Sequence, residues 1–189
     1  MSYTLITAPA TEPVTEALLR EHATLDAALS TQLLSLYLLS ARRTAEYITG
    51  RALVTQTWEA TFDSFSDALE LAMPPVQSVA SLSYYDTTGS LQVLAPSAYV
   101  LDTRTLPGYV VPAYGTSWPV TQARVNAVTV RFVCGYGTAA DVPDDIKHWM
   151  YIRAADAVDN RESIDRSGRL APVPFVDSLL DAHRVHWSV

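Results

Sequence analysis

The stretch TGRALVTQTWEATF, residues 49–62, is where a helical pattern gives way to a strand pattern. Gly50 is a residue type that often ends helices, because glycine adopts a left-handed backbone conformation at little steric cost. Beyond it, polar residues alternate with apolar ones that fall on one strand face: Val54, Trp58, Ala60 and Phe62. This alternation predicts a half-buried strand that follows shortly after a helix.

Upstream of this stretch, residues 13–50 are predicted to be helical, with a short amphipathic segment at 16–20 and a long run from Asp26 to Gly50. Mainly apolar residues form two helical stripes along the long run and the residue before it, one of Leu25, Leu29, Leu33, Leu36 and Ser40, the other of Leu34, Tyr37, Leu38, Ala41, Ala45 and Ile48. Apolar surface on two sides implies two neighbours, one of them a second subunit, or a helix that is buried all round.

Downstream, residues 51–137 have the composition of strands, and further strands are expected at 76–86, 91–94 and 126–134. Helix returns after Pro143, and a short amphipathic segment follows a polar break at 160–169. The expected fold class is α+β, a helical bundle with an inserted small, mainly antiparallel β domain and a projecting C-terminal tail. The expected parts are a helical module of residues 1–50 and 138–167, a β domain of residues 51–137 and a tail of residues 168–189.

Composition narrows the class of protein. Hydrophobic residues make up 49% of the 189 residues and charged residues 17%, which is typical of a soluble globular chain. No apolar run approaches the roughly 20 residues that cross a bilayer. The N-terminus lacks the basic start of a secretory signal, so synthesis in the cytoplasm is expected. A formal charge of -7 opposes free binding to nucleic acid, but would suit a wall past which DNA slides.

Candidates for chemistry are few. Cys134, the single cysteine, alternates with Val130 and Phe132 on the apolar strand face, which predicts a buried, unreactive thiol rather than the nucleophile of a hydrolase. His183 and His186 are spaced to touch one metal ion, but two ligands are too few. Phosphate-binding glycine motifs and a serine nucleophile motif are absent from the sequence. The sequence therefore predicts no enzyme, no cofactor and no metal site.

Two groups of residues are candidates for contacts with partners. Arg42, Arg43 and Arg51 cluster near the end of the long helix, where they would pair with a neighbouring subunit or complement the helix dipole, and the same interface is expected to include Leu36 and Tyr37. The C-terminal segment joins an extended, proline-containing approach to one amphipathic stripe. Its candidate docking residues are Pro172, Pro174, Phe175, Val176, Leu179, Leu180 and Trp187.

Short motifs in a fixed order carry a family resemblance. They are Ala41-Arg42-Arg43, residues 49–58, Pro74-Pro75-Val76-Gln77-Ser78-Val79, Tyr84-Tyr85-Asp86, Tyr99-Val100-Leu101-Asp102, Pro107-Gly108, Trp118-Pro119, Asn126-Ala127-Val128, Gly135-Tyr136-Gly137, Val142-Pro143 and Asn160-Arg161-Glu162. Together they cover nearly the whole chain. In this order the motifs resemble the phage head-tail connector family, the adaptor proteins of long-tailed phages and gene transfer agents.

The resemblance implies a structural protein of the virion neck, made and assembled in the host cytoplasm. Identical subunits would form a ring, expected to be dodecameric, on the tail-facing side of the portal protein. The ring would join the portal to a further neck or tail protein, and DNA would pass through its lumen without sequence-specific binding. The residues after Glu162 match the family least, and the docking of the C-terminal segment on the portal or on an adjacent subunit is expected from its amphipathic stripe instead. No membrane partner and no catalytic role are implied.

The aromatic residues leave open a different class of function. A β-rich carbohydrate- or protein-binding module of a virion would use exposed aromatic rings as stacking platforms. The candidates are Trp58, Tyr84, Tyr85, Tyr109, Tyr114, Trp118 and Tyr136, which equally suit an ordinary core or interface.

Overall fold

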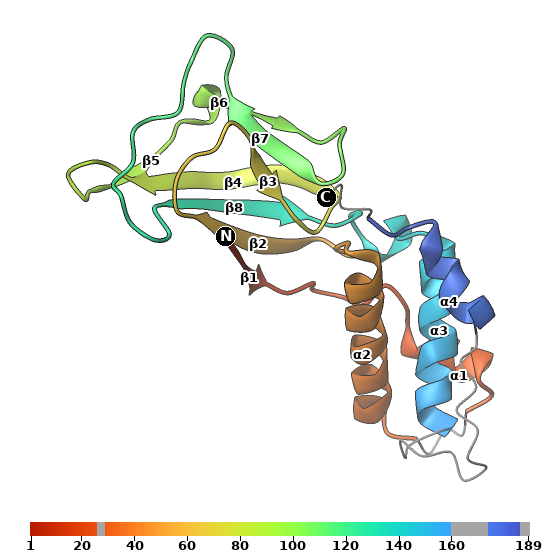
Figure 1. Cartoon of the computed structure of the whole chain (residues 1–189). Helices are drawn as coiled ribbons and strands as arrows, with labels where there is room; N and C mark the ends of the chain where they lie inside the picture. The colour runs from red at the N-terminus through yellow and green to blue at the C-terminus, as the bar shows by residue number, and fades with distance from the viewer. Residues whose placement is uncertain (26–28, 160–173, 186–189) are drawn as a thin grey trace. The chain divides into compact units, whose positions relative to one another are not determined.

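The computed structural model describes residues 1–25, 29–159 and 174–185 (Figure 1). The fold mixes helices with antiparallel sheets, which confirms the predicted α+β class. The chain forms two compact units. The sheet unit consists of Met1–Ala10 and Thr55–Tyr136, and the helical unit consists of Thr11–Val54 and the described part of residues 137–186.

The sheet unit contains two antiparallel sheets. The larger has the strand order β1 (Ser2–Thr7), β2 (Gln56–Phe62), β8 (Val128–Cys134), β4 (Val76–Tyr85) and β5 (Leu91–Val93). The smaller has the order β3 (Leu69–Leu71), β7 (Gly108–Pro112) and β6 (Tyr99–Asp102), and the 3-10 helix η1 (Pro96–Ala98) precedes β6. The strands expected at 76–86, 91–94 and 126–134 are therefore present, as β4, β5 and β8.

Register explains how the alternating patterns build the core of this unit. Trp58 lies opposite Phe132, and Ala60 lies opposite Val130, so the apolar residues of β2 and β8 share one face. Side chains of the smaller sheet, which lies over the larger one in Figure 1, are buried as well. They include Leu69, Leu71 and Val110.

The helical unit contains α1 (Glu16–His22), α2 (Thr31–Thr49), the 3-10 helix η2 (Ala139–Asp141), α3 (Asp144–Asp159) and α4 (Pro174–Asp181). α2 packs along α3, while α1 and α4 each contact both of these helices. The core includes Leu19, Leu34, Leu38, Ala41, Ala45, Ile146, Trp149, Met150, Ala154, Val158 and Leu180. Gly50 ends α2 in the left-handed conformation, with φ of 68°, as the sequence predicts.

The N-terminal ten residues differ from the expectation, which placed them in the helical module. They belong to the sheet unit, because β1 pairs antiparallel with β2 and sets Tyr3 opposite Ala60. β1 is an edge strand whose residues are almost all exposed, so it lacks the apolar alternation that reveals a half-buried strand. β3, β6 and β7, which have three to five residues each, were also not predicted individually.

The C-terminal segment also differs from the expectation, since residues 174–185 do not project. α4 packs on α3 and α2, and the Val185 amide donates to the Thr49 carbonyl at 2.8 Å. The Arg51 guanidinium donates to the His183 carbonyl. Other helices of the same unit thus cover the apolar stripe of α4. A helix this short needs such packing, because it is marginally stable alone. Within the described ranges, no helix has the length and apolar character needed to cross a bilayer.

Candidate subunit-contact surfaces

One long face of α2 is left uncovered. It comprises Leu36, Leu39, Ser40, Arg43, Thr44 and Tyr47, which line a groove and which we call the α2 outer face. The helical repeat places it opposite the buried stripe of Leu34, Leu38, Ala41 and Ala45. The side chain of Leu36 is 56% exposed and that of Tyr47 is 88% exposed. α2 is therefore not buried all round, which excludes that alternative for the single chain.

Arg42 does not lie on this face. It is buried, and its Nε and Nη1 atoms each lie 2.8 Å from a carboxylate oxygen, of Glu12 and of Glu46 respectively. Glu46 also accepts a hydrogen bond from the Leu53 amide at 3.1 Å. The prediction that Arg42 contacts a neighbouring subunit is therefore wrong, because its charge is satisfied inside the helical unit.

The remaining interface candidates are divided between surface and interior. Arg43 and Leu36 are exposed on the α2 outer face, whereas Tyr37 is half-buried beside it. Arg51 is half-buried and holds the end of the C-terminal segment. The three arginines thus do not form one cluster. The sequence-based list of interface candidates did not include Leu39 and Tyr47. They lie three and eleven positions after Leu36, a spacing that puts all three on the same helical stripe.

The C-terminal docking candidates also differ in how far they are buried. Val176 and Leu180 are buried in the helical unit, so they are core residues rather than docking residues, and Leu179 is half-buried. Pro174 and Phe175 form the start of α4. Pro172 and Trp187 lie outside the described residues.

A second exposed patch lies between α1 and α3. It comprises Leu18, His22 and His148, which are exposed, and Tyr151, which is half-buried, and we call it the α1–α3 patch. The ring centroids of His22 and Tyr151 are 5.8 Å apart, and those of His22 and His148 are 6.3 Å apart. Leu18, one turn before His22, is 51% exposed. The patch joins residues far apart in the sequence, so periodicity alone does not reveal it.

Two of the residues considered for chemistry, Cys134 and His183, make ordinary contacts, and His186 lies outside the described residues. Cys134 is completely buried, and its thiol donates to the Gln56 carbonyl at 3.8 Å. His183 Nε2 lies 3.6 Å from Asp145 Oδ2, so its imidazole contacts a carboxylate of the helical unit. Over residues 1–25, 29–159 and 174–185, no three His, Cys, Asp or Glu side chains gather in a way that would hold a metal ion.

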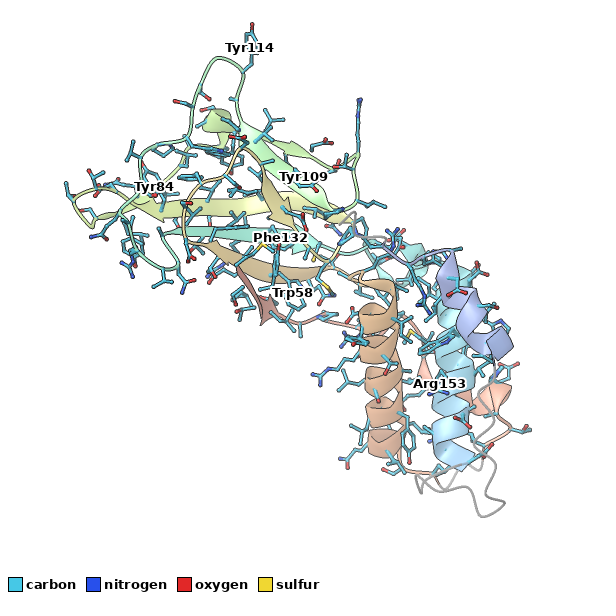
Figure 2. The ribbon with its side chains drawn as sticks, in the orientation of Figure 1. Trp58, Tyr84, Tyr109, Tyr114, Phe132 and Arg153 are labelled. Atoms are coloured by element: carbon cyan, nitrogen blue, oxygen red, sulfur yellow. The ribbon has the colours of Figure 1, made fainter. Side chains whose placement is uncertain are left out.

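The aromatic side chains occupy separate places in the sheet unit. Trp118 stacks on Phe65 with centroids 4.6 Å apart, and Tyr84 contacts the same ring edge-on. Figure 2 shows Tyr114 pointing outward from the tip of a loop. The Tyr109 hydroxyl donates to Glu70 at 3.4 Å, and loss of hydration, followed by the nearby carboxylate, raises its pKa. Trp118, Tyr84 and Tyr109 thus serve packing or a local hydrogen bond.

The fold of this chain is similar to that of chains in solved structures of gene transfer agent particles. No protein-family model matches this sequence, and no curated protein matches it. A chain of a solved structure described as "Virion of native gene transfer agent (GTA) particle" has a TM-score of 0.81 and 23% identity. Chains of "Neck of empty GTA particle computed with C6 symmetry" and "Neck of native GTA particle computed with C12 symmetry" have TM-scores of 0.80 and 0.78, with 22% and 24% identity. Each alignment covers 100% of this chain and 98% of the other, so the chain has the fold of these particle chains along its whole length.

Proposed function

We propose that this chain is a structural subunit of the virion neck of a gene transfer agent or long-tailed phage. In this role it is an adaptor that joins the portal to the tail or to the next neck protein. The supporting observation is the fold similarity to chains of gene transfer agent particles, which extends over all of this chain and 98% of theirs. A match of this extent includes both the helical and the sheet unit, rather than one widespread motif.

The proposed assembly is a ring of identical subunits, with twelve copies. Two of the similar chains belong to necks computed with C6 and with C12 symmetry, and a twelvefold ring contains the sixfold axis. A closed ring needs a head-to-tail contact between two different surfaces of each subunit. The α2 outer face, which carries Leu36 and Arg43, is the proposed subunit contact on one side.

The proposed role needs no catalysis and no cofactor. The formal charge of -7 supports a ring around a DNA passage, because a wall with excess negative charge does not hold a moving polyanion. Assembly in the host cytoplasm, contact with the portal and contact with a tail-side protein belong to the same proposal.

Particles produced without this chain test the proposal. We expect DNA-filled heads that carry portals but no tails, and we expect purified protein to restore joined particles when it is added to a lysate of heads and tails. The Cys134→Ser variant should restore joining as well as the unaltered chain, since this thiol has no role in the proposal. Normal tailed particles in the absence of the chain would contradict it. Glycan binding without any affinity for portal-bearing heads would instead favour the carbohydrate-binding module.

A further inference from the structure

We propose that the α2 outer face of one copy packs against the α1–α3 patch of the next copy. This inference rests on the ring proposed above, and it names the second surface of the subunit contact. Each of the two surfaces includes a large apolar side chain that is more than half exposed, which the helical unit itself leaves uncovered.

The two surfaces face in different directions from the helical unit. On α1, Glu16 accepts a hydrogen bond from Ser35, so this side of the helix faces α2. Leu18 and His22 lie one helical turn apart on another side of α1, where His22 contacts Tyr151 of α3. The α2 outer face, in turn, points away from the stripe that α2 buries in the unit. A contact between unlike surfaces that point apart propagates from copy to copy, as a ring requires.

Charge argues against contact between two α2 outer faces. Arg43 is exposed near the middle of this face, and none of its other five members is acidic. A twofold contact would therefore bring two guanidinium groups to one interface without a carboxylate from either face. The buried core of an interface disfavours unpaired charge.

Glu21, which borders the α1–α3 patch, offers the missing carboxylate. Glu21 is exposed on α1, and the helical repeat places it next to Leu18 on the outer side of that helix. Arg43 set against Glu21, with Leu36 and Tyr47 covering Leu18 and Tyr151, would bury apolar surface around one opposite-charge pair. Such a pair specifies the register between copies.

Cross-linking in assembled particles tests this contact. A chain with both Tyr47→Cys and Leu18→Cys should form a ladder of covalent oligomers with a short bismaleimide, because each copy then reacts with two neighbours. The buried Cys134 should not react in the folded chain. Particles assembled from a mixture of the two single-cysteine chains should give linked pairs and no ladder. Linked pairs from the Tyr47→Cys chain alone would overturn the inference, since they would place two α2 outer faces together.

A charge exchange gives a second test that does not depend on cysteine geometry. Arg43→Glu and Glu21→Arg should each lower joining of heads to tails by about tenfold or more, because each sets like charges against each other at the contact. The double variant should recover most of the activity, whereas Arg104→Glu, an exposed change in the sheet unit, should have little effect. The thermal unfolding midpoint should stay nearly constant in all four variants, because all three positions are exposed.

The two proposals fail in different ways. If particles need this chain for joining but give neither the ladder nor the charge rescue, the pairing of these two surfaces is wrong while the neck role stands. If particles join normally without the chain, the neck role itself is wrong.

Discussion

Arg42 Nη1 lies 2.8 Å from Glu46 Oε2, one helical turn away, within the buried side of α2. The same guanidinium contacts Glu12, in the segment that precedes α1, and Glu46 receives the amide of Leu53. This pair therefore ties three separate stretches of the helical unit together. Such a pair is costly to break from one side, because the remaining carboxylate is left buried without its partner.

Replacing Arg42 by Ala should destabilise folding, whereas Arg43→Ala, at the adjacent exposed position, should hardly affect it. Removal of one member of a buried ion pair typically costs ~3–5 kcal/mol, and an exposed substitution stays within about 0.5 kcal/mol. Denaturant unfolding of the two purified variants measures the difference. Equal stability of the two variants would show that the Arg42 pair contributes nothing to folding.

The C-terminal helix should contribute to the stability of the helical unit. Leu180 is completely buried, so Leu180→Ala should lower the free energy of unfolding by ~2–5 kcal/mol through loss of burial and an internal cavity. Leu179→Ala, on the same helix but half-buried, is the matched control and should cost less. Thermal unfolding compares them. An unchanged midpoint for Leu180→Ala would instead support a helix that only docks on another protein.

The turn between β4 and β5 should hold an unusually acidic carboxyl group. Hydrogen bonds from the Thr88 hydroxyl, the Gln92 amide and nearby backbone amides lower the pKa of Asp86 from 3.8 to about 2. These bonds favour the folded state at a pH above 3.8, and their contribution is lost as the pH falls through about 2. A carboxyl-carbon NMR titration measures the pKa, which Thr88→Ala should raise. A value near 3.8 in the unaltered chain would contradict this.

Gly137 should tolerate a side chain poorly. Its φ is 134°, and an added Cβ would lie 2.6 Å from Asp141 Oδ2, the oxygen that accepts the Thr138 hydrogen bonds of the capping box in η2. Gly137→Ala should therefore cost more than about 1 kcal/mol. Gly115 also has a positive φ, of 76°, but open space around it, so Gly115→Ala is the control and should cost less. Chemical denaturation of both variants checks the order.

Local periodicity predicted the elements whose burial repeats along the chain. β8 buries every second residue from Val128 to Cys134, and α3 buries Ile146, Trp149 and Met150 at helical spacing, so both were recognisable without a structure. β1 was not, since an edge strand with five exposed residues shows no such repeat. Its placement depends on pairing with β2, whose residues lie 50 to 59 positions further along the chain than their partners in β1.

The sequence by itself determined the α+β class, the end of α2 at Gly50, the burial of Cys134 and the presence of more apolar surface on α2 than one neighbour needs. Only the tertiary structure decided which side of α2 is covered, because that depends on where α3 and α4 pack. It placed Arg42 inside and Arg43, its neighbour in sequence, outside, and it covered Leu180 with the chain's own helices. A helical repeat shows which residues share a face, but the long-range contacts of the folded chain select the face that is buried.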